Sequence, residues 1–313
     1  MNLQYLNIPY LRTHRGEEVH NIRLSYEVAG PRLGSGPIVL VCHALTGNSH
    51  VAEDGWWGTL IGRGKTIDTE RYTILAFNIP GNAYDGVETD DPERYDVCDV
   101  ARLFLEGLRL LGIDRLYAII GASLGGGIAW TVAALAPKLA SILIPVACDY
   151  RSSDWLLAQT LVQERIIKHS SQPIEDARIH AMLCYRTPES LNERFAGRST
   201  RNPNKYDIVS WLEYHGDTLR QRFRLSAYAV MTYLTARIAA APSVAELARI
   251  ESDIHIISIT TDLLFPHSCA LALHRELSHY KKNVSLGIID SIHGHDAFLM
   301  EYPQLCTLLA PYF

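Results

Sequence analysis

The sequence predicts an α/β fold: a mainly parallel sheet with helices on both faces and an inserted helical lid. Short apolar runs of the kind found in strands buried on both faces recur along the chain. Helical patterns separate several of these runs, and such alternation is typical of a parallel sheet covered by helices. The strand-like runs stop between residues 149 and 252, where helical, charge-bearing sequence intervenes. We therefore expect a core made of residues 1–148 and 253–313, with residues 149–252 as the lid.

The first expected strand is Val19–Ala29, where polar and apolar residues alternate as in a half-buried antiparallel strand. A turn-rich segment with glycine and proline follows at 31–37. Apolar residues recur with helical spacing in Val97–Leu111 and Leu124–Leu135, which predicts two helices of the core. The buried strands are expected, in chain order, at Ile38–Cys42, Tyr72–Phe77, Leu116–Ile120, Ile142–Ala147, Ile254–Ile259 and Val284–Ile289.

The composition is that of a folded protein without an electrostatic signature for nucleic acid. Of the 313 residues, 48% are hydrophobic and 20% are charged, so the chain can bury a sizeable core. The 29 Lys and Arg residues are outnumbered by 34 Asp and Glu residues and form no dense basic run. We therefore expect small-molecule partners and no nucleic acid. The six cysteines lie far apart without a C-x-x-C pair, so no metal site is expected.

The opening residues lack the basic patch and continuous apolar stretch of a secretory or transit segment, which favours a cytoplasmic protein. One stretch, Leu116–Pro137, carries no charged side chain and is long enough to be weighed as a membrane span. Against a span stand the polar Ser123, the glycines at 121 and 125–127, and a β-like first half. A buried strand, a sharp turn and a buried helix explain this stretch better, and no membrane contact is expected.

The strongest chemical signal is Gly121-Ala122-Ser123-Leu124-Gly125, a G-x-S-x-G pattern where a strand is expected to end and a helix to begin. A strained turn there would expose the Ser123 hydroxyl, and a side chain at either glycine would collide with the neighbouring strand or helix. The pattern alone also fits an ordinary glycine-rich turn. Its place between a strand and a helix favours a nucleophile.

Serine is a poor nucleophile until a base takes its proton, and a carboxylate must orient that base. Where the nucleophilic serine lies on a turn between a strand and a helix, the three catalytic residues follow one another along the chain in the order Ser, acid, His. Asp262 closes the run that begins at Ile254, and His295 follows the last expected strand after a short turn, so both fit this order. Taken singly, Asp262 also fits a turn cap and His295 a loop histidine. His293 is the nearest rival base, but Gly294 permits the tight turn that presents His295.

Attack on an acyl carbonyl also needs hydrogen-bond donors for the developing negative oxygen. The segment His43–Gly47 follows the first expected parallel strand, where the second half of such a site should lie. We therefore predict an oxyanion hole made by the backbone amides of Leu45 and Leu124. We interpret His43 as a residue that fixes this loop, and not as the base.

Taken together, these residues resemble the homoserine O-acetyltransferases of the α/β-hydrolase superfamily, from about Asn21 to the C-terminus. The loop with His-Ala-Leu-Thr-Gly and the later Gly-His-Asp-Ala-Phe are far more specific than G-x-S-x-G. The matching segments are Val41–Gly47, Gly55-Trp56-Trp57, Leu60-Ile61-Gly62, Gly64-Lys65, Ile67-Asp68-Thr69, Asp262–Pro266 and Gly294–Leu299.

The resemblance implies a two-step exchange. Ser123 takes an acetyl group from acetyl-coenzyme A (acetyl-CoA), which acts as a co-substrate with no tightly bound cofactor, and the hydroxyl of homoserine then takes it from the enzyme. His295 is implied as the base and Asp262 as its partner. The resemblance also implies a homodimer formed through the lid.

Substrate-binding roles are implied for Arg178 and Tyr185 in the lid, and we assign Thr46 to the substrate site as well. Arg178 can hold a carboxylate through two hydrogen bonds, and Asp296, beside the base, can attract the ammonium of homoserine. The spacing of Arg178 and Tyr185 is about two helical turns, so both can face one pocket. Without the resemblance, Arg178 also fits a solvated surface arginine and Asp296 the start of the final helix.

Three departures from the family pattern leave the substrates open. The loop at 78–86 is shorter than the family's glycine-rich loop, Leu124 replaces the usual Met, and the lid pattern Arg-Phe-Asp-x-Asn-Ser-Tyr appears as Arg222–Tyr228 with Arg224 at the Asp position. A homoserine or serine O-succinyltransferase is therefore an alternative. An acyl-ester hydrolase is another, because the same covalent intermediate serves water as acceptor. A non-catalytic receptor on this fold is the third alternative.

Overall fold

The computed structural model describes residues 2–199 and 204–313. It contains an eight-stranded sheet in the order β1-β2-β6-β3-β7-β8-β9-β10. The first two strands pair antiparallel, β2 pairs antiparallel with β6, and the remaining neighbours are parallel. The strands are β1 (Gln4–Arg12), β2 (Glu18–Ala29), β3 (Ile38–Cys42), β6 (Thr73–Phe77), β7 (Leu116–Ala122), β8 (Ala140–Val146), β9 (Asp253–Ile259) and β10 (Val284–Ile289).

The continuous apolar runs are strands, as predicted. The bounds of β3 and β10 match the prediction, and every residue of β3 and β6 is buried. Strands β3 and β6 lie inside the sheet and are covered on both faces, so each position needs an apolar side chain. Strand β1 was not predicted, because only Ile8 and Leu11 of its nine residues are buried and its sequence lacks regular alternation.

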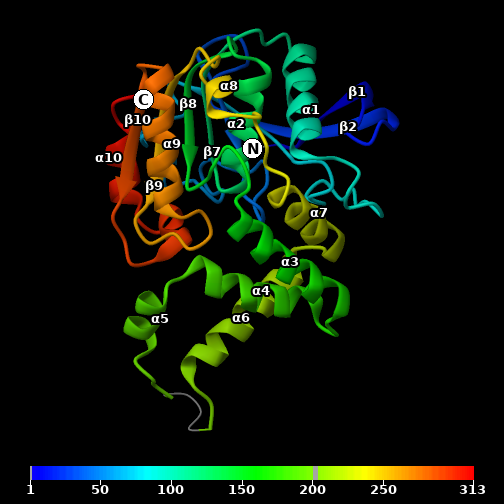
Figure 1. Ribbon diagram of the computed structural model, residues 1–313. Coiled ribbons are helices and arrows are strands. Elements are labelled where there is room, and N and C mark those ends of the chain that lie inside the picture. The colour runs from blue at the N-terminus through cyan, green and yellow to red at the C-terminus, as the bar shows by residue number, and fades with distance from the viewer. Residues whose placement is uncertain (1, 200–203) are drawn as a thin grey trace.

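One face of the sheet is covered by α1 (Val97–Leu110), α2 (Leu124–Leu135) and α9 (His267–Tyr280), as Figure 1 shows beside the strands. Helix α1 begins with a capping box, in which Asp96 accepts from the amide of Asp99 and the Asp99 carboxylate accepts from the amide of Asp96. Asp99 also accepts from the amide of His14, which ties α1 to the turn between β1 and β2.

The other face is covered largely by a segment with little regular structure. It contains two short strands, β4 (Ile61–Gly62) and β5 (Ile67–Asp68), and buries Trp57 completely. Helix α10 (Tyr302–Leu309) and the 3₁₀ helix η1 (Gly294–Leu299) complete this layer. The sheet is thus covered by helices on both faces, with an irregular segment added to the second.

Between β8 and β9 the chain forms the helices α3 (Asp154–His169), α4 (Pro173–Tyr185), α5 (Pro188–Phe195), α6 (Asp207–Arg222) and α7 (Leu225–Thr235). We call α3 to α7 the helical insertion. Figure 1 shows that it lies beyond one end of the strands, below the sheet in that view. From Ala236 the chain returns to the core, where Ile238 lies beside Gly127 and α8 (Val244–Leu247) packs against α9.

The uncharged stretch Leu116–Pro137 folds into strand β7, a turn and helix α2, as expected. In the part of the chain that the structure describes, we find no helix with the length and hydropathy needed to cross a membrane.

Candidate active site

Ser123 lies between β7 and α2 in a strained backbone conformation, with φ 55° and ψ −127°. Such φ values are costly for a residue with a side chain and persist only where the surroundings enforce them. Two glycines allow the turn. A Cβ added to Gly121 would lie 2.3 Å from the carbonyl oxygen of Gly125, and one added to Gly125 would lie 2.1 Å from that of Cys42. The neighbouring strand β3 and the start of α2 therefore leave no room for side chains at these positions, as the sequence predicted.

We expect Gly125→Ala to lower the free energy of unfolding by about 2 kcal/mol or more, because overpacking of a close-packed core typically costs ~1–3 kcal/mol. The added methyl group would meet backbone carbonyls of Cys42 and His43, which cannot rotate away as a side chain can. Chemical denaturation measures the loss. Gly36→Ala is the matched control, since its Cβ would come no closer than 3.4 Å to Arg71. Equal stabilities of the two variants would contradict the packing argument.

The three residues predicted as a triad come together. His295 Nε2 lies 2.9 Å from Ser123 Oγ, and His295 Nδ1 lies 2.7 Å from Asp262 Oδ2. Exposed fractions of 6% for Ser123, 4% for Asp262 and 3% for His295 show that this line is shielded from water. The second oxygen of Asp262 accepts from the backbone amides of Leu264 and Phe265, at 2.8 Å each. Those two bonds fix the carboxylate, so that Oδ2 faces the imidazole.

The imidazole of His295 is held among aromatic rings. The rings of Phe265 and Tyr185 lie with their centroids 5.6 Å from that of His295, and Phe298 lies at 5.4 Å. Gly294, just before it, has φ +66°, and a Cβ there would lie 2.8 Å from the carbonyl oxygen of Tyr185. The turn before His295 therefore requires glycine.

The rival base, His293, does not reach Ser123. Its Nδ1 lies 2.8 Å from Ser190 Oγ and 3.3 Å from an Arg186 nitrogen, so it belongs to a contact with the helical insertion. Arg186 is 5% exposed and donates twice to Ser190 Oγ. Thr187 Oγ1 also donates to the carbonyl of Ile292. The link between α4 and α5 thus holds the loop that carries His295.

The predicted oxyanion loop lies against the start of α2. The backbone amides of Leu45 and Leu124 donate to no other residue among those that the structure describes. Leu124 is the first residue of α2, where amides have no acceptor within the helix. Neither amide is therefore held by another acceptor in the described part of the chain, as the predicted oxyanion hole requires.

His43 fixes this loop through buried hydrogen bonds. Its Nδ1 lies 2.9 Å from the carbonyl oxygen of Ala44, and its Nε2 accepts from the amide of Ile79 at 3.0 Å. Asn82 Nδ2 lies 3.2 Å from the same Nε2. Burial lowers the pKa of His43 to about 4, so the ring is neutral near pH 7 and one nitrogen can accept. This geometry fits the interpretation of His43 as a loop-fixing residue.

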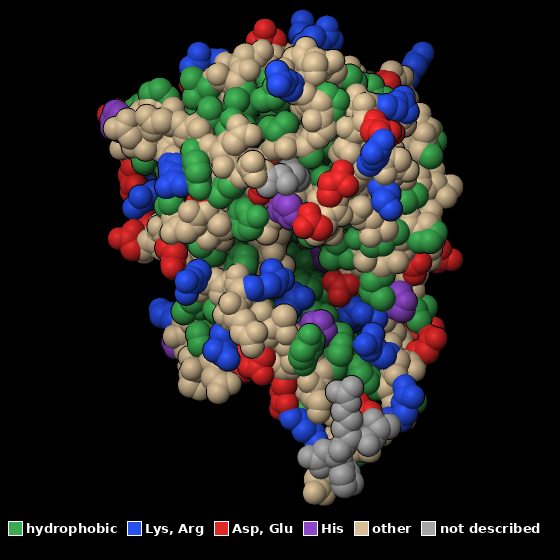
Figure 2. Space-filling view, turned by 180° about the vertical axis from the view of Figure 1, so that it is seen from behind, with side chains coloured by type: hydrophobic (Ala, Val, Ile, Leu, Met, Phe, Trp, Pro, Cys, Tyr) green, Lys and Arg blue, Asp and Glu red, His purple; other side chains and the backbone are tan. Residues whose placement is uncertain are grey.

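Arg178, Tyr185 and Asp296 are placed around the triad. The Arg178 guanidinium carbon lies 5.5 Å from the ring centroid of Tyr185, on the same face of α4. Burial raises the pKa of Asp296, and the nearby charge of Arg178 partly offsets this. Among the described residues, Arg178 forms no ion pair, so its charge is available to a ligand. Figure 2 shows a hollow between the sheet and the helical insertion, with Lys, Arg and His side chains around it and Asp or Glu side chains among them.

Known proteins that are similar to this chain identify its family. A family model described as "alpha/beta hydrolase fold" matches residues 37–148. A homoserine O-acetyltransferase of Salinibacter ruber is 30% identical, in an alignment that covers 98% of this chain and 96% of the relative. The chain belongs to the homoserine O-acetyltransferase family. The family resemblance predicted from the sequence motifs is thereby confirmed.

Solved structures agree with membership of this family. The crystal structure of homoserine O-acetyltransferase from Staphylococcus aureus matches with a TM-score of 0.85 and 25% identity, covering 99% of this chain and 94% of that one. Esterase E22 matches with a TM-score of 0.86 at 19% identity, over 99% of both chains, and this likeness concerns the fold alone. The predicted α/β-hydrolase fold is confirmed.

Sequence reasoning missed the buried polar network behind the oxyanion loop. Glu27 of β2, 1% exposed, accepts from Ser49 Oγ, and Asn78 links Ser49 to Ser25 through its side-chain amide. Asn78 and Asn82 belong to the shortened loop, which therefore supports His43. A charged residue in the apolar half of a strand was the available signal, because a buried carboxylate needs hydrogen-bond partners.

Proposed function

We propose that this enzyme transfers an acetyl group from acetyl-CoA, through an acyl-enzyme on Ser123, to the hydroxyl of L-homoserine, a step of methionine biosynthesis. The observation that carries the proposal is the hydrogen-bonded line from Ser123 through His295 to Asp262, in a chain of this family. The unpaired guanidinium of Arg178 beside that line supports an acceptor with a carboxylate.

In the first half-reaction, Ser123 Oγ attacks the thioester carbonyl while His295 Nε2 takes the hydroxyl proton. The amides of Leu45 and Leu124 stabilise the oxyanion, and Asp262 stabilises the imidazolium through Nδ1–H. The intermediate then collapses, the carbon–sulfur bond breaks, and the thiolate of coenzyme A leaves with the proton held by His295. An acetyl ester on Ser123 remains.

In the second half-reaction, the homoserine hydroxyl gives its proton to His295 and attacks the acetyl ester. Collapse of the new intermediate returns a proton to Ser123 Oγ and releases O-acetylhomoserine. Arg178 binds the acceptor carboxylate, and Asp296 binds its ammonium. Tyr185 lies between Arg178 and His295, and burial raises its pKa to about 12, so its hydroxyl stays protonated and can donate to the acceptor.

A matrix of donors and acceptors tests the proposal. Purified enzyme is given acetyl-CoA or succinyl-CoA, with homoserine, serine or no acceptor, and the release of free thiol is followed. We expect the fastest release with acetyl-CoA and homoserine. Equal release with and without homoserine would instead favour an esterase, and faster release from succinyl-CoA would favour a succinyltransferase. The expected homodimer stays a prediction, which light scattering in solution can check.

Arg178→Gln is expected to raise the KM for homoserine by about 10–100-fold, because a hydrogen-bonded charge contributes ~1.5–3 kcal/mol. The burst of thiol that reports the first half-reaction should change little, since Arg178 does not touch the acetyl group in this mechanism. Arg165→Gln, an exposed arginine of α3, is the control. Selective loss of the burst in the Arg178 variant would contradict its assignment to the acceptor.

A further inference from the structure

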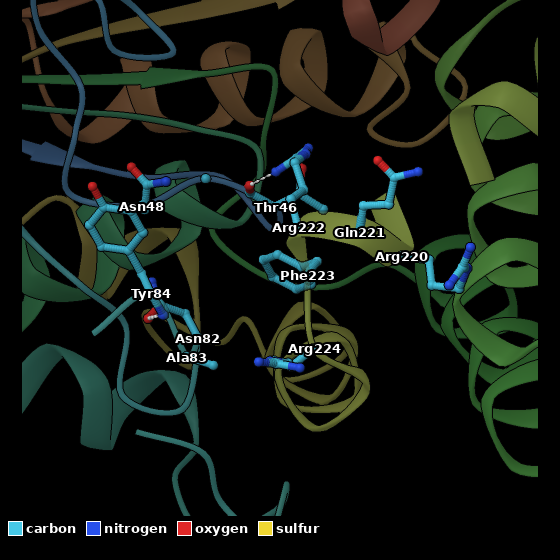
Figure 3. A pocket seen from close by; sticks show the side chains of 11 residues that line it. Thr46, Asn48, Asn82, Ala83, Tyr84, Arg220, Gln221, Arg222, Phe223 and Arg224 are labelled. Atoms are coloured by element: carbon cyan, nitrogen blue, oxygen red, sulfur yellow. Dashed lines mark hydrogen bonds between the residues drawn. The ribbon is translucent and has the colours of Figure 1, made fainter. Parts of the chain in front are cut away.

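A second cavity opens where the oxyanion loop meets the link between α6 and α7 (Figure 3). Its volume is about 290 Å³. Thr46 of the oxyanion loop and Asn48 just after it line one side, and Arg220, Arg222 and Arg224 line it from the insertion. Among the described residues that line this cavity, three are arginines and none is acidic. Such a lining is suited to a ligand with several negative charges.

We propose that this cavity binds the phosphoryl groups of the acyl-CoA donor, through Arg222 and Arg224. The inference rests on the proposed function, in which the donor is the one substrate with several negative charges. It adds a second binding region to the site, distinct from the acceptor contacts of Arg178 and Asp296.

Arg222 connects this cavity to the reaction centre. Its Nη1 donates to the carbonyl oxygen of Thr46 at 3.2 Å, next in the chain to Leu45, whose amide is assigned to the oxyanion hole. In the part of the chain that the structure describes, no carboxylate pairs with Arg222. Partial burial and the charge of Arg178 lower the pKa of Arg222, although a guanidinium remains charged at neutral pH. A phosphoryl group would neutralise this charge.

Arg224 is available for the same ligand. Its pairing with Glu88 is long, 3.6 Å, and both side chains are well exposed, so the pair contributes little to stability. Figure 3 shows Arg222 and Arg224 on either side of Phe223, whereas Arg220 lies apart, where it pairs with Glu175 at 2.6 Å. We therefore assign phosphate binding to the first two. Arginine binds phosphate through two parallel hydrogen bonds, and the long, exposed pair with Glu88 leaves Arg224 free to exchange Glu88 for a phosphoryl group.

The rest of the lining suits the nucleotide part of coenzyme A. Asn48 offers an amide group, and Tyr84 is 42% exposed, which gives an aromatic surface on which an adenine can stack. Burial and the neighbouring Glu27 raise the pKa of Tyr84 to about 12, so the phenol stays neutral and does not repel phosphate. Tyr84 belongs to the loop that is shortened relative to the family pattern, and Arg224 replaces that pattern's Asp.

The test compares two donors that carry the same thioester. S-acetylpantetheine lacks the phosphoryl groups and adenosine of acetyl-CoA. For Arg224→Gln we expect the KM for acetyl-CoA to rise about tenfold, the loss typical of one charge-assisted hydrogen bond, and the KM for S-acetylpantetheine to rise less than twofold. Arg224→Lys should recover part of the loss. Arg249→Gln is the control, because Arg249, just after α8, is exposed and pairs with Glu246 of that helix.

Calorimetric titration with adenosine 3′,5′-bisphosphate gives a readout that needs no turnover. We expect binding by the wild type, about tenfold weaker binding by Arg224→Gln, and a further loss in the double variant Arg222→Gln/Arg224→Gln. Equal binding by all variants, or equal effects on the two donors, would overturn the phosphate assignment even if acetyl transfer is confirmed. A selective rise in the KM for homoserine would overturn it too. The arginine variants could lose bisphosphate binding while the wild type transfers acetyl from no thioester. That result would reject the proposed function and retain the binding site.

Discussion

Ser123→Ala should yield a protein that folds normally and forms no acetyl adduct. Removing the nucleophile of a serine triad lowers kcat by roughly 10⁶-fold. Because alanine also has a Cβ, the strained backbone at φ 55° persists, and we expect little change in stability. Intact mass spectrometry after treatment with acetyl-CoA measures the outcome: the wild type gains the mass of one acetyl group when homoserine is withheld, and the variant gains none.

Another hydroxyl of the same segment, that of Thr131, provides a matched control. Thr131 lies in α2, where its Oγ1 donates to the carbonyl of Gly127, and Thr131→Ala should leave the adduct intact. An acetyl group that maps to another residue in the Ser123→Ala protein would overturn the nucleophile assignment. So would full turnover by this variant.

Asp262→Asn should lower kcat by about 10⁴-fold, the loss known for the same change in another serine triad. The backbone amides of Leu264 and Phe265 both donate to Oδ1, so an asparagine keeps its oxygen there and presents its NH₂ group to His295. The imidazole must then accept at Nδ1 and carry its proton on Nε2. In that tautomer His295 cannot take the proton of Ser123. Steady-state thiol release measures the loss.

Asp253→Asn is the matched control at the other end of β9, where the carboxylate accepts from Asn283 Nδ2. It removes a charge from the same strand without touching the triad, so kcat should change less than twofold. If Asp262→Asn retained wild-type activity with unchanged folding, the proposed role of Asp262 as orienting carboxylate would be wrong.

The core of the fold could be predicted because burial on both faces leaves a local trace in the sequence. Strand β3 and helix α2 have the predicted bounds, since neither carries a charged side chain and glycine or proline lies close to its ends. Strand β1 leaves no such trace, because it pairs along one side with β2 and stays mostly exposed. The irregular segment around Trp57 was also not predicted as a covering layer, because its burial has neither a helical nor a strand period.

The triad could be predicted for a different reason: a fixed chain order and glycine-bounded turns mark Ser123 and His295. The hydrogen bonds of Arg186 with Ser190 and His293 join segments far apart in the chain, and no local pattern marks them. The proposed phosphate site also could not be predicted from a local pattern. Arg222 and Arg224 look like surface arginines until the fold brings Arg222 beside Thr46 and both into one cavity.

The hydrogen bonds between the α4–α5 link and the loop before His295 affect how such enzymes can be redesigned. A chimaera that grafts a relative's insertion onto this core would replace Arg186, Thr187 and Ser190 together with the acceptor contacts. The loop that carries His295 would lose these hydrogen bonds unless the grafted insertion supplied equivalent ones. New acceptor specificity is therefore better sought by single exchanges around Arg178 than by swapping whole modules.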